Sequence, residues 1–317
     1  MFRYIVRRLV LMVPMVLFIT AFVFLLGQYG APDLALERTL RLNNNVFDQE
    51  IYENLKLNMG LDGSPVERFV RFVGNAVQGD FGVSYSLPGN PDVGRLILGA
   101  LPISLQLGLA ALVIALAVGI PAGVLAAVYR NRPLDYAIVT VSTVLSSIPP
   151  FVLGPVALVL LVSTFQVLPS TGFGWHGLFS TETLLPASVL AAGPLLVVLR
   201  FTRSSVIDVL SQDYIRAARA KGLSTAALVR RHVVRNAMTP VLSALGVVAG
   251  FLLSGTIFIE TVFGIRGFGH VTVTAFQSGD VNTVAAATLV SGLIAAIVNL
   301  LTDLLYGVLD PRVKVSA

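Results

Sequence analysis

The chain has no cysteine, a single tryptophan and few charged residues, since Lys, Arg, Asp and Glu together make up only 12% of its 317 residues. The absence of cysteine excludes disulfides, thiol catalysis and cysteine-ligated metal sites. A soluble domain carries about 25% charged residues. Hydrophobic residues make up 55% of this chain instead, with a mean hydropathy of +0.83. The composition therefore predicts a polytopic membrane protein.

The sequence also has no motif that indicates catalysis. There is no G-x-x-x-x-G-K-[ST] phosphate loop, no H-E-x-x-H and no G-x-S-x-G. The histidines, His176, His232 and His270, fall in different predicted loops, so we expect no metal site. An ion-coupled secondary transporter would carry acidic residues deep in its spans. Glu260 and Asp303 lie near the predicted ends of spans, which disfavours an ion-coupled transporter. Because the catalytic motifs are missing, we expect neither enzyme activity nor a bound cofactor.

Six stretches are long and apolar enough to span a bilayer, for which about 20 helical residues suffice. We predict an all-α protein with spans at 8–29, 103–128, 136–163, 185–203, 240–261 and 283–306. Several prolines interrupt these spans, and they predict either ordinary kinks or local breaks that line a pathway. These are Pro14, Pro121, Pro149, Pro150, Pro155 and Pro194. The first span is too long for the apolar region of a signal peptide, so we expect it to remain a membrane helix.

The basic residues predict the orientation. With both termini on the cytoplasmic side, 15 of the 22 Lys and Arg lie inside, which agrees with the positive-inside rule. Six of the remaining seven fall in one long outer loop, where the rule has little force. The net charge of +5 is therefore a topology signal, and no nucleic-acid partner is expected because the charges are dispersed among loops.

The predicted organisation has four parts: residues 1–30 with the first span, an extracytoplasmic segment at 31–97, a membrane-spanning core of five helices at 98–310 and a cytoplasmic tail at 311–317. In the outer segment, "SPVERFVRFVGNAVQGD" predicts an amphipathic helix with Ser64 as N-cap, Pro65 in the first turn and Glu67 completing a capping box. Its predicted apolar face packs on the bundle or the outer interface, or docks an outer partner. That face consists of Val66, Phe69, Val70, Val73 and Val77.

The cytoplasmic loop at 204–239, between the fourth and fifth spans, contains the stretch "DYIRAARAKG". Gly222 is a good helix stop, and Ser224 is predicted to cap a second helix at about 225–238 that ends at Pro240. The small side chains of Ala217 and Ala218 allow close approach of a partner. The pattern indicates a short helix lying in a groove on another protein, or else a basic segment on anionic lipid head groups.

This stretch resembles the EAA motif of permease subunits of bacterial ABC importers, and most of all the B-type subunits of dipeptide and oligopeptide importers. Further stretches resemble the family in order along nearly the whole chain: "MFRYIVRRLVLMVP", "QGDFGVSYS", "LPISLQLGLAAL", "GIPAGVLAA", "LSSIPPFVLG", "RFTRSSVIDVL", "RHVVRNAMTPV", "ETVFG" and "LLYGVLDPR". The chain departs from the family at Arg216, where EAA permeases generally have Glu, and at Ile265 and Arg266, where relatives often have an aromatic residue and Pro.

The resemblance implies the ABC type I importer permease fold, a bacterial inner-membrane location and a cytoplasmic coupling helix. It implies a heterodimer with a second homologous permease subunit, two cytoplasmic ATPase subunits that use ATP and Mg, and an extracytoplasmic peptide-binding protein. The coupling helix would dock on an ATPase groove. Its matching residues are Asp213, Tyr214, Arg216, Ala217, Ala218, Lys221 and Gly222.

We expect small and apolar residues to line a pathway that accepts peptides of varied side chains. The candidates on the third and fifth spans are Ser142, Ser146, Ser147, Pro149, Pro150, Ser254, Thr256 and Glu260. Ser and Thr also serve as contacts between helices in lipid. The expected cargo is a di- or oligopeptide; similar permeases carry glutathione or nickel, and these remain alternatives.

Overall fold

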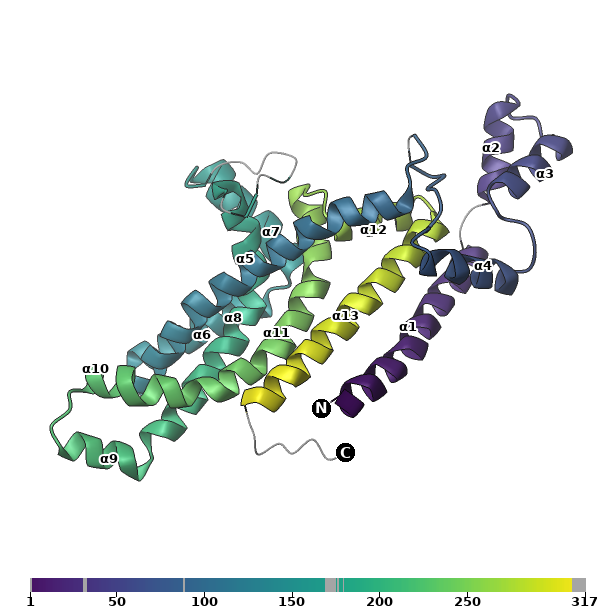
Figure 1. Cartoon of the computed structure of the whole chain (residues 1–317). Helices are drawn as coiled ribbons and strands as arrows, with labels where there is room; N and C mark the ends of the chain where they lie inside the picture. The colour runs from purple at the N-terminus through teal and green to yellow at the C-terminus, as the bar shows by residue number, and fades with distance from the viewer. Residues whose placement is uncertain are drawn as a thin grey trace. The chain divides into compact units, whose positions relative to one another are not determined.

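The computed structural model describes residues 2–30, 33–87, 89–168, 175, 177–178 and 180–309 (Figure 1). The described residues are mostly helical and form no β-sheet; their only bridge pairs Val83 with Asp92. The all-α class predicted from the sequence is therefore confirmed. The helices are α1 (Phe2–Gly30), α2 (Leu34–Leu42), α3 (Gln49–Asn58), α4 (Pro65–Val77), α5 (Val93–Val128), α6 (Pro133–Ser147), α7 (Pro150–Ala157), η1 (Leu158–Thr164), α8 (Thr181–Leu210), α9 (Asp213–Ala220), α10 (Thr225–Leu228), η2 (Val229–Val233), α11 (Val234–Phe263), α12 (Phe268–Gln277) and α13 (Val281–Leu309).

Four described helices are long and apolar enough to cross a membrane: α1, α5, α8 and α13. A fifth candidate is the bent pair of Pro133–Ser147 and Pro150–Thr164, whose two arms differ in direction by 101°. The predicted span at 240–261 falls within the 30-residue helix α11. The count of six spans stays a prediction. The 36 residues of α5 extend about 54 Å, well beyond a hydrocarbon core of ~30 Å, so α5 must tilt or project from it.

The proline-rich spans behave in two ways. Pro14, Pro155 and Pro194 lie inside continuous helices. Pro149 and Pro150 instead coincide with the 101° bend between Pro133–Ser147 and Pro150–Thr164. A proline disfavours helical backbone at the residue before it, and here Ile148 and Pro149, which both precede a proline, are extended with ψ of 121° and 142°. The break in the third predicted span thus follows from two consecutive prolines.

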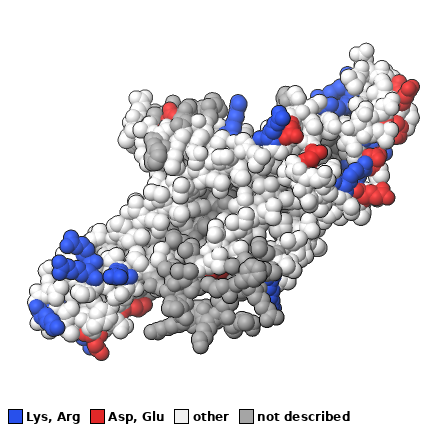
Figure 2. All heavy atoms as spheres, in the orientation of Figure 1, with Lys and Arg blue, Asp and Glu red and all other residues white. Residues whose placement is uncertain are grey.

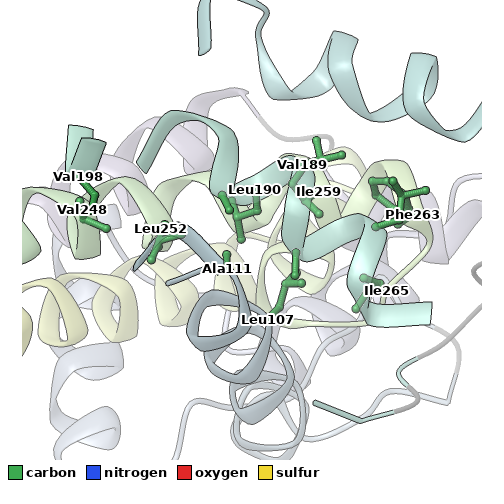
Figure 3. Packing of buried hydrophobic residues seen from close by; sticks show 14 of the residues in the cluster. Leu107, Ala111, Val189, Leu190, Val198, Val248, Leu252, Ile259, Phe263 and Ile265 are labelled. Carbon is green, nitrogen blue, oxygen red and sulfur yellow. The ribbon is translucent and has the colours of Figure 1, made fainter. Parts of the chain in front are cut away.

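The chain divides into two compact units. Residues 103–266 form the bulk of the first unit, which also takes the last part of α13. In this unit α11 packs most extensively against α8, and both helices also contact α7. Residues of α5 join those of α8 and α11 in one core (Figure 3). The core between them is aliphatic. It includes Leu107, Ala111, Val189, Leu190, Val198, Val248, Leu252 and Ile259.

Two glycines allow α5 to approach α8 closely. Gly119 and Gly123 are four residues apart and therefore lie on the same face of α5. A Cβ at Gly123 would lie 2.7 Å from the carbonyl oxygen of Leu199, and one at Gly119 would lie 3.0 Å from a methyl of Val198. This is the small-residue packing typical of membrane helices.

The second predicted helix of the cytoplasmic loop does not end at Pro240. Instead, α10, η2 and α11 follow one another without a break, and Pro240 lies inside α11. That part of the prediction was wrong. Proline removes one backbone hydrogen bond and disturbs the preceding turn. In this turn the hydroxyl of Ser205 on α8 donates to the carbonyl of Ala237 at 2.8 Å, as Ser side chains commonly do near prolines in membrane helices.

The second unit comprises residues 5–102 and 267–296. Its core contains Phe24 of α1, Phe72 of α4, and Val93 and Ile97 of α5. The capping box predicted at Ser64 and Glu67 is present at the start of α4. The predicted apolar face of α4 is divided in the structure. Phe69 and Val73 pack on the core beside Phe72, whereas Val66, Val70 and Val77 are exposed, because the phenylalanines bury more apolar area than the valines and so orient the helix.

Candidate coupling surface

The site begins with the short helix α9, which leaves α8 through Ser211 and Gln212. Gln212 has extended backbone, and Asp213 stands in the first turn, where a carboxylate favours the helix dipole. Gly222 adopts φ +83°, the left-handed conformation that glycine tolerates best. The N–H of Gly222 bonds the carbonyl of Arg219 at 3.0 Å, and that of Leu223 bonds Ala218 at 3.4 Å. These two bonds form a Schellman cap, so the predicted stop at Gly222 is confirmed.

One side of α9 is anchored in its own unit. Ile215 is buried in a cluster with Leu228, Val233 and Val206, and Ala218 packs at its edge. The Tyr214 hydroxyl accepts a hydrogen bond from Asn236 of α11 at 2.9 Å. The helix therefore rests on residues of α8, α10, η2 and α11. Ile215 was not among the sequence candidates, although its apolar character between polar neighbours is a detectable signal.

The other side of α9 is open. Asp213, Tyr214, Arg216, Ala217 and Lys221 are exposed, as is Gly222. Arg216 contacts Asp213 at 3.4 Å, but both side chains are largely in solvent and the pair contributes little. The two predicted alanines thus differ, since Ala217 faces outward while Ala218 is half-buried against the anchor.

The charge of this surface is strongly positive. Residues 204–239 contain six Lys or Arg and two Asp, a net of +4, and all eight are exposed. Figure 2 shows these cations gathered over α9 and α10, at the end of the first unit. Ser224 caps α10 by accepting from the N–H of Ala227 at 3.4 Å, as predicted. The π-helical turn η2 follows and carries Arg230 and Arg231. A rigid cationic helix of this kind can dock on a complementary acidic groove.

The candidate pathway residues lie on α6, α7 and α11. Ser146 and Ser147 donate to the carbonyl of Thr143 in their own helix, at 3.0 and 2.7 Å. Ser142 is half-buried on the same helix, while Pro149 and Pro150 are exposed at the bend. These five are neighbours because they belong to one stretch of chain.

On α11, Thr256 and Glu260 are buried. Glu260 accepts a hydrogen bond from the hydroxyl of Ser104 on α5. Burying a carboxyl group without a partner is costly, so this bond supports its place in the core. The side chain of Ser254 lies outside the described residues. In this conformation Glu260 therefore joins two helices.

An ion pair that sequence reasoning missed lies at the start of α6. Asp135 is buried and bonds both Nε and Nη2 of Arg203 on α8, at 2.8 and 2.7 Å. An acidic residue at the edge of an apolar span, opposite an arginine-rich end, is the signal that could have found it.

The described helices define a polytopic helical membrane protein. A solved structure of the MetNI methionine ABC transporter in an inward-facing conformation has a chain with a TM-score of 0.55 to this one; the match covers 68% of this chain and 96% of that chain at 16% identity. At that identity the likeness shows the fold alone.

Residues 119–315 match the family described as the binding-protein-dependent transport system inner membrane component, and the chain belongs to this family. It is 33% identical over 316 residues to the dipeptide transport system permease protein DppB of Bacillus subtilis, covering 99% of this chain and 98% of that protein. It is 34% identical over 319 residues to the glutathione transport system permease protein GsiC of Escherichia coli K12, covering 99% of each. The chain is thus an inner-membrane permease component of an ABC importer, a class that works with ATPase and binding-protein partners.

Proposed function

We propose that this permease component forms part of the translocation pathway for di- or oligopeptides and receives the energy of ATP through α9. The proposal includes three kinds of partner protein. They are a second, homologous permease subunit, two cytoplasmic ATPases that bind ATP and Mg, and an extracytoplasmic peptide-binding protein. Both termini of the chain are cytoplasmic in this scheme, and the chain itself catalyses no reaction.

The observation that carries the proposal is the two-sided construction of α9. Its inner side is anchored by Ile215, while its outer side presents Arg216, Ala217 and Lys221 to solvent. Because α9 leads directly from α8 and the same loop continues into α11, a displacement of α9 acts on the two helices that pack most extensively in this unit. Rigid packed elements of this kind transmit motion between sites. The alternative, a basic segment resting on anionic lipid, does not require such an anchor.

The docking proposal is tested by reversing charge on the open side. Arg216→Glu with Lys221→Glu should abolish co-purification of the ATPase subunits and peptide-stimulated ATP hydrolysis. The matched control is Arg230→Glu with Arg235→Glu, two exposed cations of the same loop on η2 and α11. Unchanged assembly and coupled hydrolysis in the α9 variant would contradict docking through this face. Equal loss in both variants would indicate general electrostatic attraction, as to lipid.

The cargo is tested separately. The names of the relatives support dipeptides first and glutathione second. The complete complex in proteoliposomes, with ATP on the cytoplasmic side, should take up a labelled dipeptide. Uptake of glutathione or nickel without dipeptide uptake would overturn the peptide assignment. Uptake by this chain alone, driven by an ion gradient, would contradict the importer mechanism altogether.

A further inference from the structure

The second unit contains a polar hollow at the outer end of α1 that no part of the coupling scheme uses. It has a volume of about 190 Å³ and adjoins a second hollow of about 290 Å³. Both are lined by Arg68 of α4, Met59, Tyr85 and Asn282. Arg68 is partly buried between them. These hollows are smaller than clefts that hold drug-sized ligands, so they suit a fragment such as a terminal group.

Arg68 has no salt bridge and no hydrogen bond among the described residues. A partly buried guanidinium whose five N–H donors meet no protein acceptor among the described residues is uncommon, because desolvating a charge without pairing it costs free energy. Burial, followed by the positive charge of Arg71, lowers the pKa of Arg68 below its ordinary value. An arginine nevertheless remains protonated in proteins. The hollow therefore contains a positively charged hydrogen-bond donor, and its complement is an acceptor group on a ligand.

The other uncommitted groups of the first hollow are also donors. The amide nitrogen of Gln28 is buried and has no hydrogen-bond partner within the part of the chain that the structure describes. The ammonium of Lys56 lies 5.7 Å from the ring centroid of Tyr52 and forms no salt bridge among the described residues. Arg68, Lys56 and Gln28 therefore offer donors and, apart from the amide oxygen of Gln28, no acceptor.

The acids of the same hollow are already engaged. Asp33 accepts from the hydroxyl of Tyr52 at 2.9 Å and from the N–H of Leu36 at 3.0 Å. Asp280 is buried and accepts from the hydroxyls of Ser84 and Thr283. The formal charges of the lining balance, yet Asp33 and Asp280 accept hydrogen bonds from neighbours, while Arg68 and Lys56 donate none among the described residues. A ligand that completes this site must supply acceptor atoms.

The walls of the hollow are fixed in advance. Tyr85 donates to the carbonyl of Asn58 at 3.1 Å, and its own carbonyl accepts from Arg38 at 2.6 Å. Nη1 of Arg71 on α4 contacts both carboxylate oxygens of Asp62, and Nη2 donates to the carbonyl of Asp62 at 2.7 Å. Phe69 and Phe72 of α4 each stand with their ring centroids 5.6 Å from that of Phe24. Preorganisation of this kind lowers the cost of binding.

We propose that the hollow at Arg68 binds the carboxylate of a short peptide on the extracytoplasmic side of the permease. The planar fork of arginine matches a carboxylate with two parallel hydrogen bonds. Lys56 and Gln28 supply further donors to the same group. The choice of a peptide as bearer of the carboxylate rests on the proposed function, and the outer location rests on the predicted orientation.

The test uses the full chain purified in lipid nanodiscs, without ATPases, and measures binding of the dipeptide Ala-Ala by calorimetry. The expected result is saturable binding of Ala-Ala and roughly ten- to a hundredfold weaker binding of its C-terminal amide, which lacks the charged acceptor. Arg68→Met should weaken Ala-Ala binding by the same factor, and Arg68→Lys by less, because lysine keeps the charge but not the fork.

Arg41→Met is the matched control, since Arg41 is exposed on α2, pairs with Glu37 and lines neither hollow. Its binding of Ala-Ala should equal that of the unmodified chain. The comparison of acid with amide needs no variant, so it holds even if Arg68→Met fails to fold. Equal binding of acid and amide, or undiminished binding by a folded Arg68→Met, overturns the proposal.

A further outcome shows whether the carboxylate belongs to a peptide or to an acidic side chain of the binding protein. If Arg68→Met leaves Ala-Ala binding intact but weakens association with the extracytoplasmic binding protein, an acidic side chain of that protein occupies the hollow and the proposal is wrong. Failure of the proposed function is distinguishable, because it shows as absent ATP-driven peptide uptake by the complete complex. Binding to this chain alone does not depend on that cycle.

Discussion

The guanidinium of Arg203 donates to both carboxylate oxygens of Asp135, from Nε at 2.8 Å and from Nη2 at 2.7 Å. The N–H of Asn131 donates a third bond to the same carboxylate at 3.0 Å. The pair joins the start of α6 to α8, about two turns before α8 ends and the chain enters α9. The ion pair of Asp135 with Arg203 therefore holds the C-terminal end of α8, which leads into the candidate coupling surface on α9.

We expect Asp135→Asn to destabilise the protein by about 3 kcal/mol, because breaking a buried pair leaves Arg203 uncompensated. We take the low end of the range for breaking a buried ion pair, because the Arg203 side chain is 29% exposed and water can solvate part of its charge. Thermal unfolding in detergent measures the change. Asp208→Asn, at an exposed site on α8, is the control. The double variant Asp135→Leu with Arg203→Met should recover much of the loss, and no recovery would show that the pair is not the cause.

Gly123→Ala should destabilise the contact of α5 with α8 by about 1–3 kcal/mol, because the added methyl overlaps the backbone of Leu199. Gly108→Ala on the same helix is a matched control, since a Cβ there meets nothing within 4 Å. That variant should be neutral or slightly stabilising. Equal unfolding temperatures for the two variants would argue against close packing at Gly123.

Two substitutions on α9 should separate its anchor from its open side. Ile215→Ala removes a buried side chain and should cost about 2–5 kcal/mol of local stability, measured by hydrogen exchange in residues 213–222. Ala217→Leu adds bulk at an exposed position and should change stability by less than about 0.5 kcal/mol. It should nevertheless reduce ATPase co-purification. Normal assembly in Ala217→Leu would place the docking face elsewhere.

The pKa of Tyr52 on α3 should lie above its ordinary value, because its hydroxyl donates to Asp33 and because burial and the charges of Asp33 and Glu53 oppose ionisation. The folded pKa is raised, so the stabilising contribution is present below the unfolded tyrosine pKa of about 10 and is lost as pH rises through the folded value. Absorbance titration of tyrosinate, as a difference from Tyr52→Phe, measures this pKa.

Asp33→Asn should bring the pKa of Tyr52 back toward its ordinary value, since the amide keeps a capping oxygen but loses the charge. Asp48→Asn is the control, because the Asp48 side chain caps α3 by accepting from Glu50 and Ile51, and Asp48 bonds Tyr52 through its backbone carbonyl, which the substitution leaves in place. If Asp33→Asn left the titration of Tyr52 unchanged, the hydrogen bond to Asp33 would not be the dominant cause.

The sequence by itself determined the class of this protein. Long apolar runs and scarce charge require a helical membrane chain, because unpaired backbone groups cannot remain in lipid. Local signals were equally reliable where the interaction is local: the capping box at Ser64, the stop at Gly222 and the cap at Ser224 each involve residues within a few positions of one another. The match to the transport family followed from the same residues in order.

Only the tertiary structure decided what depends on residues far apart in the chain. It placed Ile215 inward and Ala217 outward on α9, continued the helix through Pro240, and set Phe72 rather than Val66 against the core. It also paired Asp135 with Arg203 and left Arg68 in its hollow without an ion-pair partner among the described residues. Helical periodicity defines which residues share a face, but the neighbouring helices determine which face is buried and which charges meet a partner.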